Sequence, residues 1–89
     1  MAELDVQVVA TDHAVWQGKA SSIRGRTVDG DMGILPGHAP VLAVLGEGDL
    51  VIEVSDGHTV TASVSGGFFS VDSNQVTIVA DDADLTSNA

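Results

Sequence analysis

The chain has 89 residues, no cysteine and a formal net charge of −10, with 13 acidic side chains against three lysines and arginines. This length allows one small domain, the missing cysteines exclude disulfides and thiolate metal sites and mildly favour a cytosolic protein, and the negative charge disfavours nucleic acid and anionic lipids as partners. No segment approaches the roughly 18 consecutive apolar residues of a membrane span, and the start of the chain lacks the basic residues of a signal peptide.

The first 28 residues show the alternation of apolar and polar side chains that is typical of half-buried β-strands. Residues 4–10 alternate, and residues 11–13, which read Thr-Asp-His, interrupt the pattern. Residues 15–28 bring further apolar side chains, with Gly18 and Gly25 between them. Because glycines inside a strand favour bends and bulges, this stretch predicts short strands rather than one long ladder.

Residues 30–40 do not follow the alternation, and they contain three glycines and two prolines. Pro36 fixes its own φ at about −65°, and Gly37 can take the positive φ of the next turn position, so the pair predicts a type II turn. Pro40 favours an extended Ala39 ahead of the apolar stretch that follows. We therefore expect a pre-shaped loop, which is a favourable place for recognition.

Two hairpins follow this loop. Residues 50–54 and 60–64 alternate on either side of Asp56-Gly57, where glycine suits a tight turn. A second hairpin turns at Asp72-Ser73-Asn74 and continues into residues 76–80. Short strands with turns about every 8 to 12 residues predict a sandwich or a barrel.

The three aromatic residues differ in their expected environments. Phe68 and Phe69 are adjacent, so in a strand they point to opposite faces. Phe69 shares its parity with Val71 and is expected inside, which leaves Phe68 for a surface that meets a partner. Trp16 suits either an interface or the core, and the core is the commoner environment.

The sequence offers little for catalysis or for metal binding. Cysteine and tyrosine are absent, and no serine lies in a nucleophile elbow. The glycines near Asp31 lack the lysine and the helix of a phosphate-binding loop. The histidines at positions 13, 38 and 58 have no metal-ligand spacing. The aspartates at positions 81, 82 and 84 suit a solvated tail better than a weak calcium site. We expect no enzyme, no metal and no cofactor.

The stretch Gly30-Asp31-Met32-Gly33-Ile34-Leu35-Pro36-Gly37-His38-Ala39-Pro40 resembles the signature loop of ATP synthase epsilon subunits. The resemblance extends over roughly residues 4 to 84 and includes, in family order, residues 4–9, 15–18, 65–68 and 76–81. It implies an all-β fold, a two-sheet antiparallel β-sandwich of about ten short strands. We place this domain at residues 1–84 and a polar C-terminal tail at residues 85–89.

The resemblance also implies a function. The family's sandwich is a non-catalytic rotor part that links the gamma subunit to the c-ring and couples proton flow to ATP synthesis. The expected location is the cytoplasmic face of the bacterial plasma membrane, with the membrane met only through the c-ring. The family's two C-terminal helices have no counterpart here, so we expect neither an inhibitory hairpin nor a nucleotide site. Residue 89 is either a natural end, which we expect, or the edge of a fragment.

Two contact regions carry over to matching positions. The expected c-ring contacts are Asp29, Gly30, Asp31 and Met32, and the expected gamma contacts are His38, Ala39, Pro40, Ala43 and Ser65. The loop is shaped by Gly33, Pro36 and Gly37. Turn formation is the alternative role of the two aspartates, and a hydrogen bond to local backbone is the alternative for His38.

Other classes of function remain open on composition alone. A free-standing β-sandwich that binds a peptide or a sugar through its rigid loop is the main alternative. Such a module would be a stable monomer that is indifferent to the gamma subunit. A small enzyme with this fold would instead need a concave pocket with converging polar groups.

Overall fold

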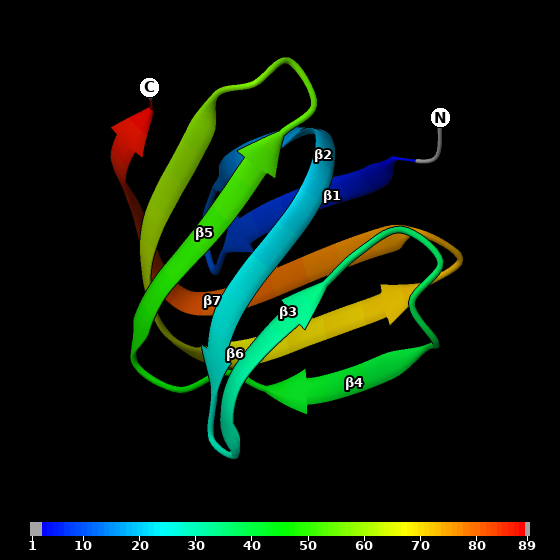
Figure 1. Cartoon of the computed structure of the whole chain (residues 1–89). Coiled ribbons are helices and arrows are strands. Elements are labelled where there is room, and N and C mark those ends of the chain that lie inside the picture. The colour runs from blue at the N-terminus through cyan, green and yellow to red at the C-terminus, as the bar shows by residue number, and fades with distance from the viewer. Residues whose placement is uncertain (1–2, 89) are drawn as a thin grey trace.

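The computed structural model describes the backbone of residues 3–88 and the side chains of residues 3–85, and within this range every regular element is a β-strand (Figure 1). The strands in chain order are β1 (Leu4–Ala10), β2 (Ala14–Thr27), β3 (Gly30–Ile34), β4 (Val41–Val44), β5 (Gly48–Val54), β6 (Thr59–Asp72) and β7 (Gln75–Asn88). No helix in this range is long and apolar enough to cross a membrane.

The strands form two packed sheets because β2, β6 and β7 each bend and contribute one half to either sheet. In the first sheet β4 pairs with the end of β6, which pairs with the start of β7, then β1, then the start of β2. In the second sheet β3 pairs with the end of β2, followed by β5, the start of β6 and the end of β7. The all-β sandwich is confirmed, and its seven strands, with the three long ones counted as halves, match the expected ten segments. The expectation of antiparallel pairing needs one correction, because β1 and β7 run parallel to each other.

Gly66 and Gly67 form the corner where β6 passes from one sheet to the other. Both have positive φ, 68° and 113°. A Cβ on Gly67 would lie 1.9 Å from the carbonyl oxygen of Val79, so only glycine fits the crossing of the two chains. Inward side chains are Val64 before the corner and Phe69 after it. Even-numbered residues of β6 therefore face the core before the corner, and odd-numbered residues face it after the corner.

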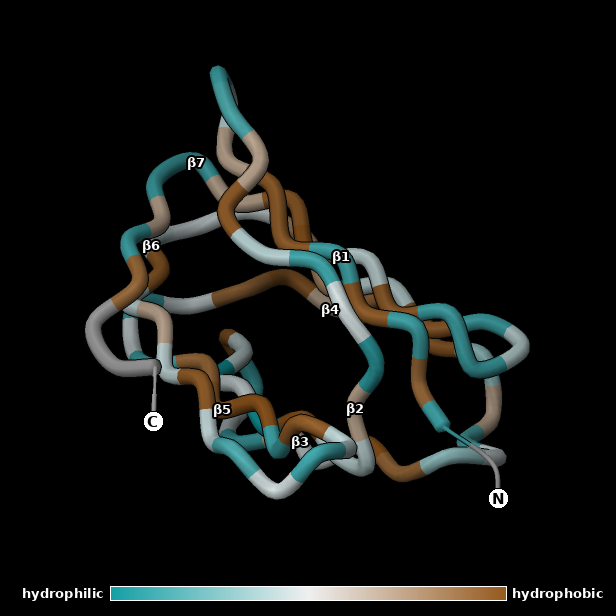
Figure 2. Tube along the Cα trace, turned by 90° about the horizontal axis from the view of Figure 1, so that it is seen from above, coloured by the Kyte–Doolittle hydropathy of each residue, from teal (hydrophilic) through white to brown (hydrophobic). Residues whose placement is uncertain are grey.

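The core lies between the sheets and is almost wholly aliphatic. Its largest fully buried side chains include Phe69, Leu4, Ile23, Leu50 and Ile78. Buried residues alternate with exposed ones along the strands, and Figure 2 shows this alternation of apolar and polar residues. Burial of these side chains, at about 1.5–3 kcal/mol each, is the main stabilising contribution in a chain without cysteines.

Several local expectations can be compared with the structure. Phe69 is fully buried and Phe68 is exposed, as predicted. The hairpin at Asp56-Gly57 joins β5 to β6, as predicted. Trp16 is half-buried and packs against the core. Residues 14–27 form one continuous strand instead of several, because an irregularity between Ala20 and Ser22 lets β2 bend without ending.

Two further expectations need correction. Residues 30–34 are not loop but the edge strand β3, because they pair with the end of β2 and Ile34 is buried. Residues 85–88, expected in a polar tail, continue β7 and pair with the start of β6. Main-chain pairing needs no apolar side chains, which explains why composition did not reveal it. Ala89, like Met1 and Ala2, lies outside the described residues.

Candidate functional site

The expected c-ring contacts lie in the turn between β2 and β3 and in the first residues of β3, and this turn projects from the lower end of the molecule in Figure 1. Thr27 organises this turn, because its hydroxyl donates to the Gly30 carbonyl at 2.8 Å and accepts from the Asp29 amide at 3.2 Å. Thr27 is the one buried polar residue among the described residues. Asp29 is exposed beside Val28 at the tip.

Asp29 and Asp31 differ in how their charges are used. The Asp31 carboxylate lies 3.3 Å from Nε of Arg26 on the neighbouring strand. The ion pairs found among the described residues do not include Asp29. Asp29 therefore offers its charge to a partner more freely than Asp31 does. Met32, the last member of this set, is half-buried and packs against the core.

The expected gamma contacts His38, Ala39 and Pro40 lie in the loop between β3 and β4 and are all exposed. The predicted type II turn is present, since Gly37 has a φ of 86° and the His38 amide donates to the Leu35 carbonyl at 3.2 Å. Nδ1 of His38 lies 2.7 Å from the Ala39 carbonyl. A carbonyl can only accept, so Nδ1 carries the proton and Nε2 stays available to a partner. Both expected roles of His38 are thus compatible.

The remaining expected positions lie on strands and not in this loop. Ala43 is half-buried on β4 and packs against the core. Ser65 is exposed on β6, immediately before the glycine corner. Gly33 lies within β3 without a positive φ, so of the three expected loop-shaping residues only Pro36 and Gly37 form the turn. The sequence-derived site is therefore spread over one loop, one turn and three strands.

Sequence reasoning missed an apolar row that crosses the outer face of the first sheet. The strand registers place its four residues opposite one another on neighbouring strands. Three are strongly exposed for their type, at 48% for Val44, 54% for Phe68 and 44% for Val79, and Val9 is half-buried. We call this set the apolar row: Val44, Phe68, Val79 and Val9.

The apolar row extends at its β4 end. Leu42, two residues before Val44 and on the same face, is 72% exposed. The Val28 amide, in the β2–β3 turn, donates to the Val44 carbonyl at 3.0 Å, and the Val28 side chain is exposed. The row thus begins beside the turn that carries Asp29, while β4 leads back to the loop that carries His38.

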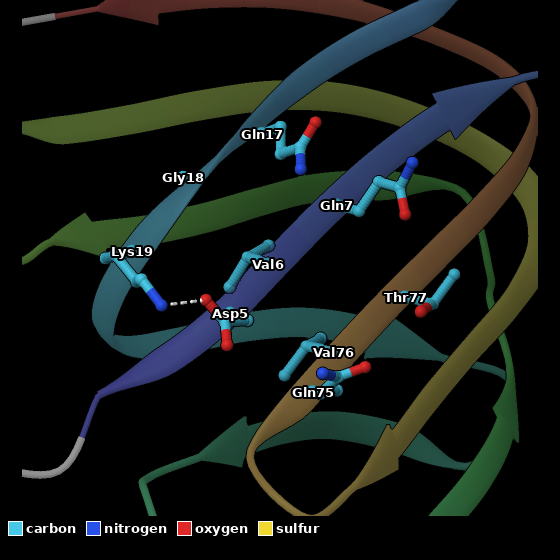
Figure 3. Close-up of a pocket in the computed structure, with 9 residues that line it drawn as sticks. All are labelled: Asp5, Val6, Gln7, Gln17, Gly18, Lys19, Gln75, Val76 and Thr77. Atoms are coloured by element: carbon cyan, nitrogen blue, oxygen red, sulfur yellow. Dashed lines mark ion pairs between the residues drawn. The ribbon is translucent and has the colours of Figure 1, made fainter.

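The same outer face is polar four residues away along β1, β6 and β7, and also on the neighbouring strand β2. The registers align a second set there, which we call the polar row: Asp72, Gln75, Asp5 and Lys19. Figure 3 shows Gln7, Gln17 and Thr77 beside Gln75, Asp5 and Lys19 of this row around a shallow hollow, with an ion pair between Asp5 and Lys19. That carboxylate raises the pKa of Lys19 above its ordinary value by hydrogen bonding and by its charge.

Two of the histidines interact with an aspartate next to them in sequence or two residues away. His13 contacts Asp12 at 2.6 Å and lowers the pKa of that carboxyl. The His58 amide donates to Asp56 at 3.0 Å, and this bond is the main reason why the pKa of Asp56 is lowered. No group of three or more metal-ligating side chains forms a site in the part of the chain that the structure describes.

Comparison with known proteins identifies the family of the chain. The family model of the ATP synthase delta/epsilon chain β-sandwich domain matches residues 3–86. The ATP synthase epsilon chain of Micrococcus luteus is 54% identical over 85 residues, which cover 96% of this chain and 93% of the relative. The ATP synthase epsilon chain of Streptomyces coelicolor is 47% identical over 85 residues, which cover 96% of this chain and 68% of the relative.

Two solved structures are also similar. A chain in the cryo-EM structure of the Euglena gracilis mitochondrial ATP synthase, solved with OSCP, F1 and the c-ring, matches with a TM-score of 0.89 at 29% identity. The match covers 96% of this chain but only 54% of the Euglena chain. A central-stalk structure from Tetrahymena thermophila mitochondrial ATP synthase matches with a TM-score of 0.71 at 23% identity, which shows the fold alone. The family model and the bacterial relatives cover nearly all of the sequence, and the chain therefore belongs to the ATP synthase epsilon chain family.

Proposed function

We propose that this chain is a non-catalytic central-stalk subunit of an F-type proton-translocating ATP synthase, linking the gamma subunit to the c-ring on the cytoplasmic face of a bacterial plasma membrane. In this role it couples proton flow to ATP synthesis by transmitting torque. Family membership supports the assignment, and the apolar row is the observation on this molecule that carries it.

The apolar row has the properties of a docking surface for gamma. It crosses four adjacent strands, and at about 4.8 Å per strand it is about 14 Å wide. Single exposed apolar residues are normal, but contiguous apolar patches mark interaction sites. Phe68 lies in its interior, where aromatic side chains often dominate binding energy. The loop at His38 and the small Ala39 extend the same contact around the start of β4.

The β2–β3 turn has the properties of a contact for the c-ring loops. It is a narrow projection with an exposed carboxylate at Asp29 and no large side chain except Val28 at its tip. A carboxylate that is not engaged within the chain can pair with a basic group of a partner. Such a rim contact orients the partners and speeds association more than it adds affinity.

The body between these two contacts is suited to transmitting force. Three long strands run through both sheets, so a load on the first sheet passes into the second through continuous main chain. Close-packed interiors have low compressibility and transmit strain. A rigid connector between gamma and the c-ring needs this property and no chemistry.

The gamma contact is tested by titration calorimetry of the chain with the gamma subunit from the same bacterium. We expect Phe68→Glu to weaken binding at least about thirtyfold, because it places a charge in the centre of an apolar contact. Gln7→Glu is the matched control, since it adds the same charge to the polar part of the same face and should bind normally. If the unaltered chain fails to bind gamma and remains a monomer, a free-standing binding module becomes the better assignment.

The c-ring contact is tested with the gamma complex of the chain and purified c-ring. Asp29→Asn should weaken association by up to about fivefold and reduce its salt dependence, in keeping with a rim ion pair. Asp31→Asn should have a smaller effect, because Asp31 already contacts Arg26. Asp29→Glu keeps the charge and serves as control. Equal affinities for all three variants would remove Asp29 from the contact.

A further inference from the structure

Asn74, in the turn between β6 and β7, joins two segments that are far apart in sequence. Its side-chain Oδ1 accepts a hydrogen bond of 2.7 Å from the Gly37 amide, at the centre of the loop that carries His38. Its main-chain carbonyl accepts a bond of 2.8 Å from the Asp5 amide at the start of β1. In Figure 1 the β3–β4 loop and the β6–β7 turn lie side by side at the right of the view.

The bond to Gly37 is the connection of this loop to the rest of the protein. The other hydrogen bonds of residues 35–40 within the described part of the chain are local, from the His38 amide to the Leu35 carbonyl and from the His38 ring to the Ala39 carbonyl. The loop's side chains, apart from a half-buried Pro36, are exposed. Packing therefore does little to fix its orientation, and the Asn74 side chain supplies the constraint.

The choice of asparagine at position 74 also needs an explanation that the turn alone does not give. Ser73 and Asn74 have φ values of 51° and 64°, which is a tight turn with two left-handed residues. Glycine is preferred at the second of these positions, and asparagine tolerates it. Glycine would thus suit the turn better but would remove the acceptor for Gly37.

We infer that Asn74 is a positioning residue that holds the loop of residues 36–40 in the conformation that binds gamma. This inference rests on the proposed function. A loop fixed before binding loses less conformational entropy on association, so the hold on Gly37 contributes to affinity without a contact between Asn74 and the partner.

The test compares Asn74→Gly with Asn74→Asp and with Ser73→Gly as a matched turn control. Amide hydrogen exchange of Gly37 is measured by NMR in the isolated chain, and gamma affinity by calorimetry. For Asn74→Gly we expect exchange at Gly37 to accelerate about tenfold and gamma binding to weaken several-fold, while the fold stays intact. Asn74→Asp keeps an oxygen acceptor at the same place, so its Gly37 exchange rate and its gamma affinity should equal those of the unaltered chain. Ser73→Gly should change neither.

Two results would overturn the inference. One is unaltered Gly37 exchange in Asn74→Gly, and the other is faster exchange with unchanged gamma affinity. A failure of the unaltered chain to bind gamma would instead contradict the proposed function, and the exchange rates would still decide whether Asn74 holds the loop.

Discussion

The outer face of the first sheet contains two rows of residues that lie close together and differ completely in chemistry. One is the apolar row of Val44, Phe68, Val79 and Val9, and the other is the polar row of Asp72, Gln75, Asp5 and Lys19. The residues that alternate with both rows are equally buried, for example Ile78 and Val8 near the first and Val76 and Val6 near the second. The inner face of the sheet is therefore equally apolar and equally buried beneath both rows.

This comparison separates the demands of folding from those of binding. Folding requires apolar side chains only on the inner face, and the polar row shows that the outer face can be fully solvated without loss of the sheet. The apolar row exposes hydrophobic area that the fold does not need. A partner that covers this area is the simplest physical reason for it.

The largest expected effect comes from breaking the corner that presents Phe68 at the surface. In Gly67→Ala the new Cβ would meet the Val79 carbonyl, and the residue would keep a φ that side chains rarely adopt. We expect a loss of about 3 kcal/mol or more in the free energy of unfolding, measured by urea denaturation. The apolar row should be disturbed more than the polar row, because the Gly67 carbonyl also anchors the Leu45 amide at the end of β4.

Gly57→Ala is the control for this prediction. Gly57 also has a positive φ, 99°, but a Cβ there would meet nothing within 4 Å. Gly57→Ala should therefore lower the free energy of unfolding only by the backbone strain, about 1 kcal/mol. Equal losses for the two variants would show that the clash at Val79 does not determine the corner.

An exchange of similar side chains sharpens the comparison between the rows. Val79→Thr keeps the shape of a branched side chain but puts a hydroxyl into the apolar row, and should weaken gamma binding by about 1 kcal/mol, or about fivefold. Thr77→Val makes the reverse change two residues away, beside the polar row, and should leave affinity unchanged. Urea denaturation should show little effect of Val79→Thr, because Val79 is 44% exposed. The contrary outcome is equal weakening by both variants, which would spread the contact over the whole face.

Much of the fold follows from properties that are local in the sequence. The parity of Phe69 and Val71 predicted the inner face, and Pro36-Gly37 predicted the turn that the structure contains. The corner at Gly66 and Gly67 was not expected, because the need for glycine at Gly67 arises from contact with a carbonyl on β7. The same limit explains why residues 30–34 were expected as loop. Their pairing partner, and not their composition, makes them a strand.

The proposed contact surface was less accessible to sequence reasoning for the same reason. The family resemblance supplied the loop and the turn, and adjacent phenylalanines indicated that one aromatic residue would be exposed. The row that joins Val44, Phe68, Val79 and Val9 exists only once three strand registers are known. The bond between Gly37 and Asn74 spans 37 positions and had no signal in the sequence. A run of exposed apolar residues at matching strand positions is the signal to seek in related sequences.

The smallest expected effect concerns the ion pair that closes the polar row. Lys19 and Asp5 are both more than half exposed, so Lys19→Gln should change the midpoint of urea denaturation only slightly and gamma affinity not at all. The sign of its pH dependence is fixed, because the pKa of Lys19 is raised in the folded chain. Whatever stability the pair contributes is complete below the ordinary lysine pKa and is lost as the pH rises through the higher folded value. The difference in free energy of unfolding between the unaltered chain and Lys19→Gln should thus be constant near neutrality and vanish in strong alkali. Urea denaturation across this pH range measures the difference, and NMR measures the pKa of Lys19. A lysine pKa at or below its ordinary value, or a difference that grows with alkalinity, would mean that Asp5 does not hold Lys19 and that the polar row is solvated residue by residue.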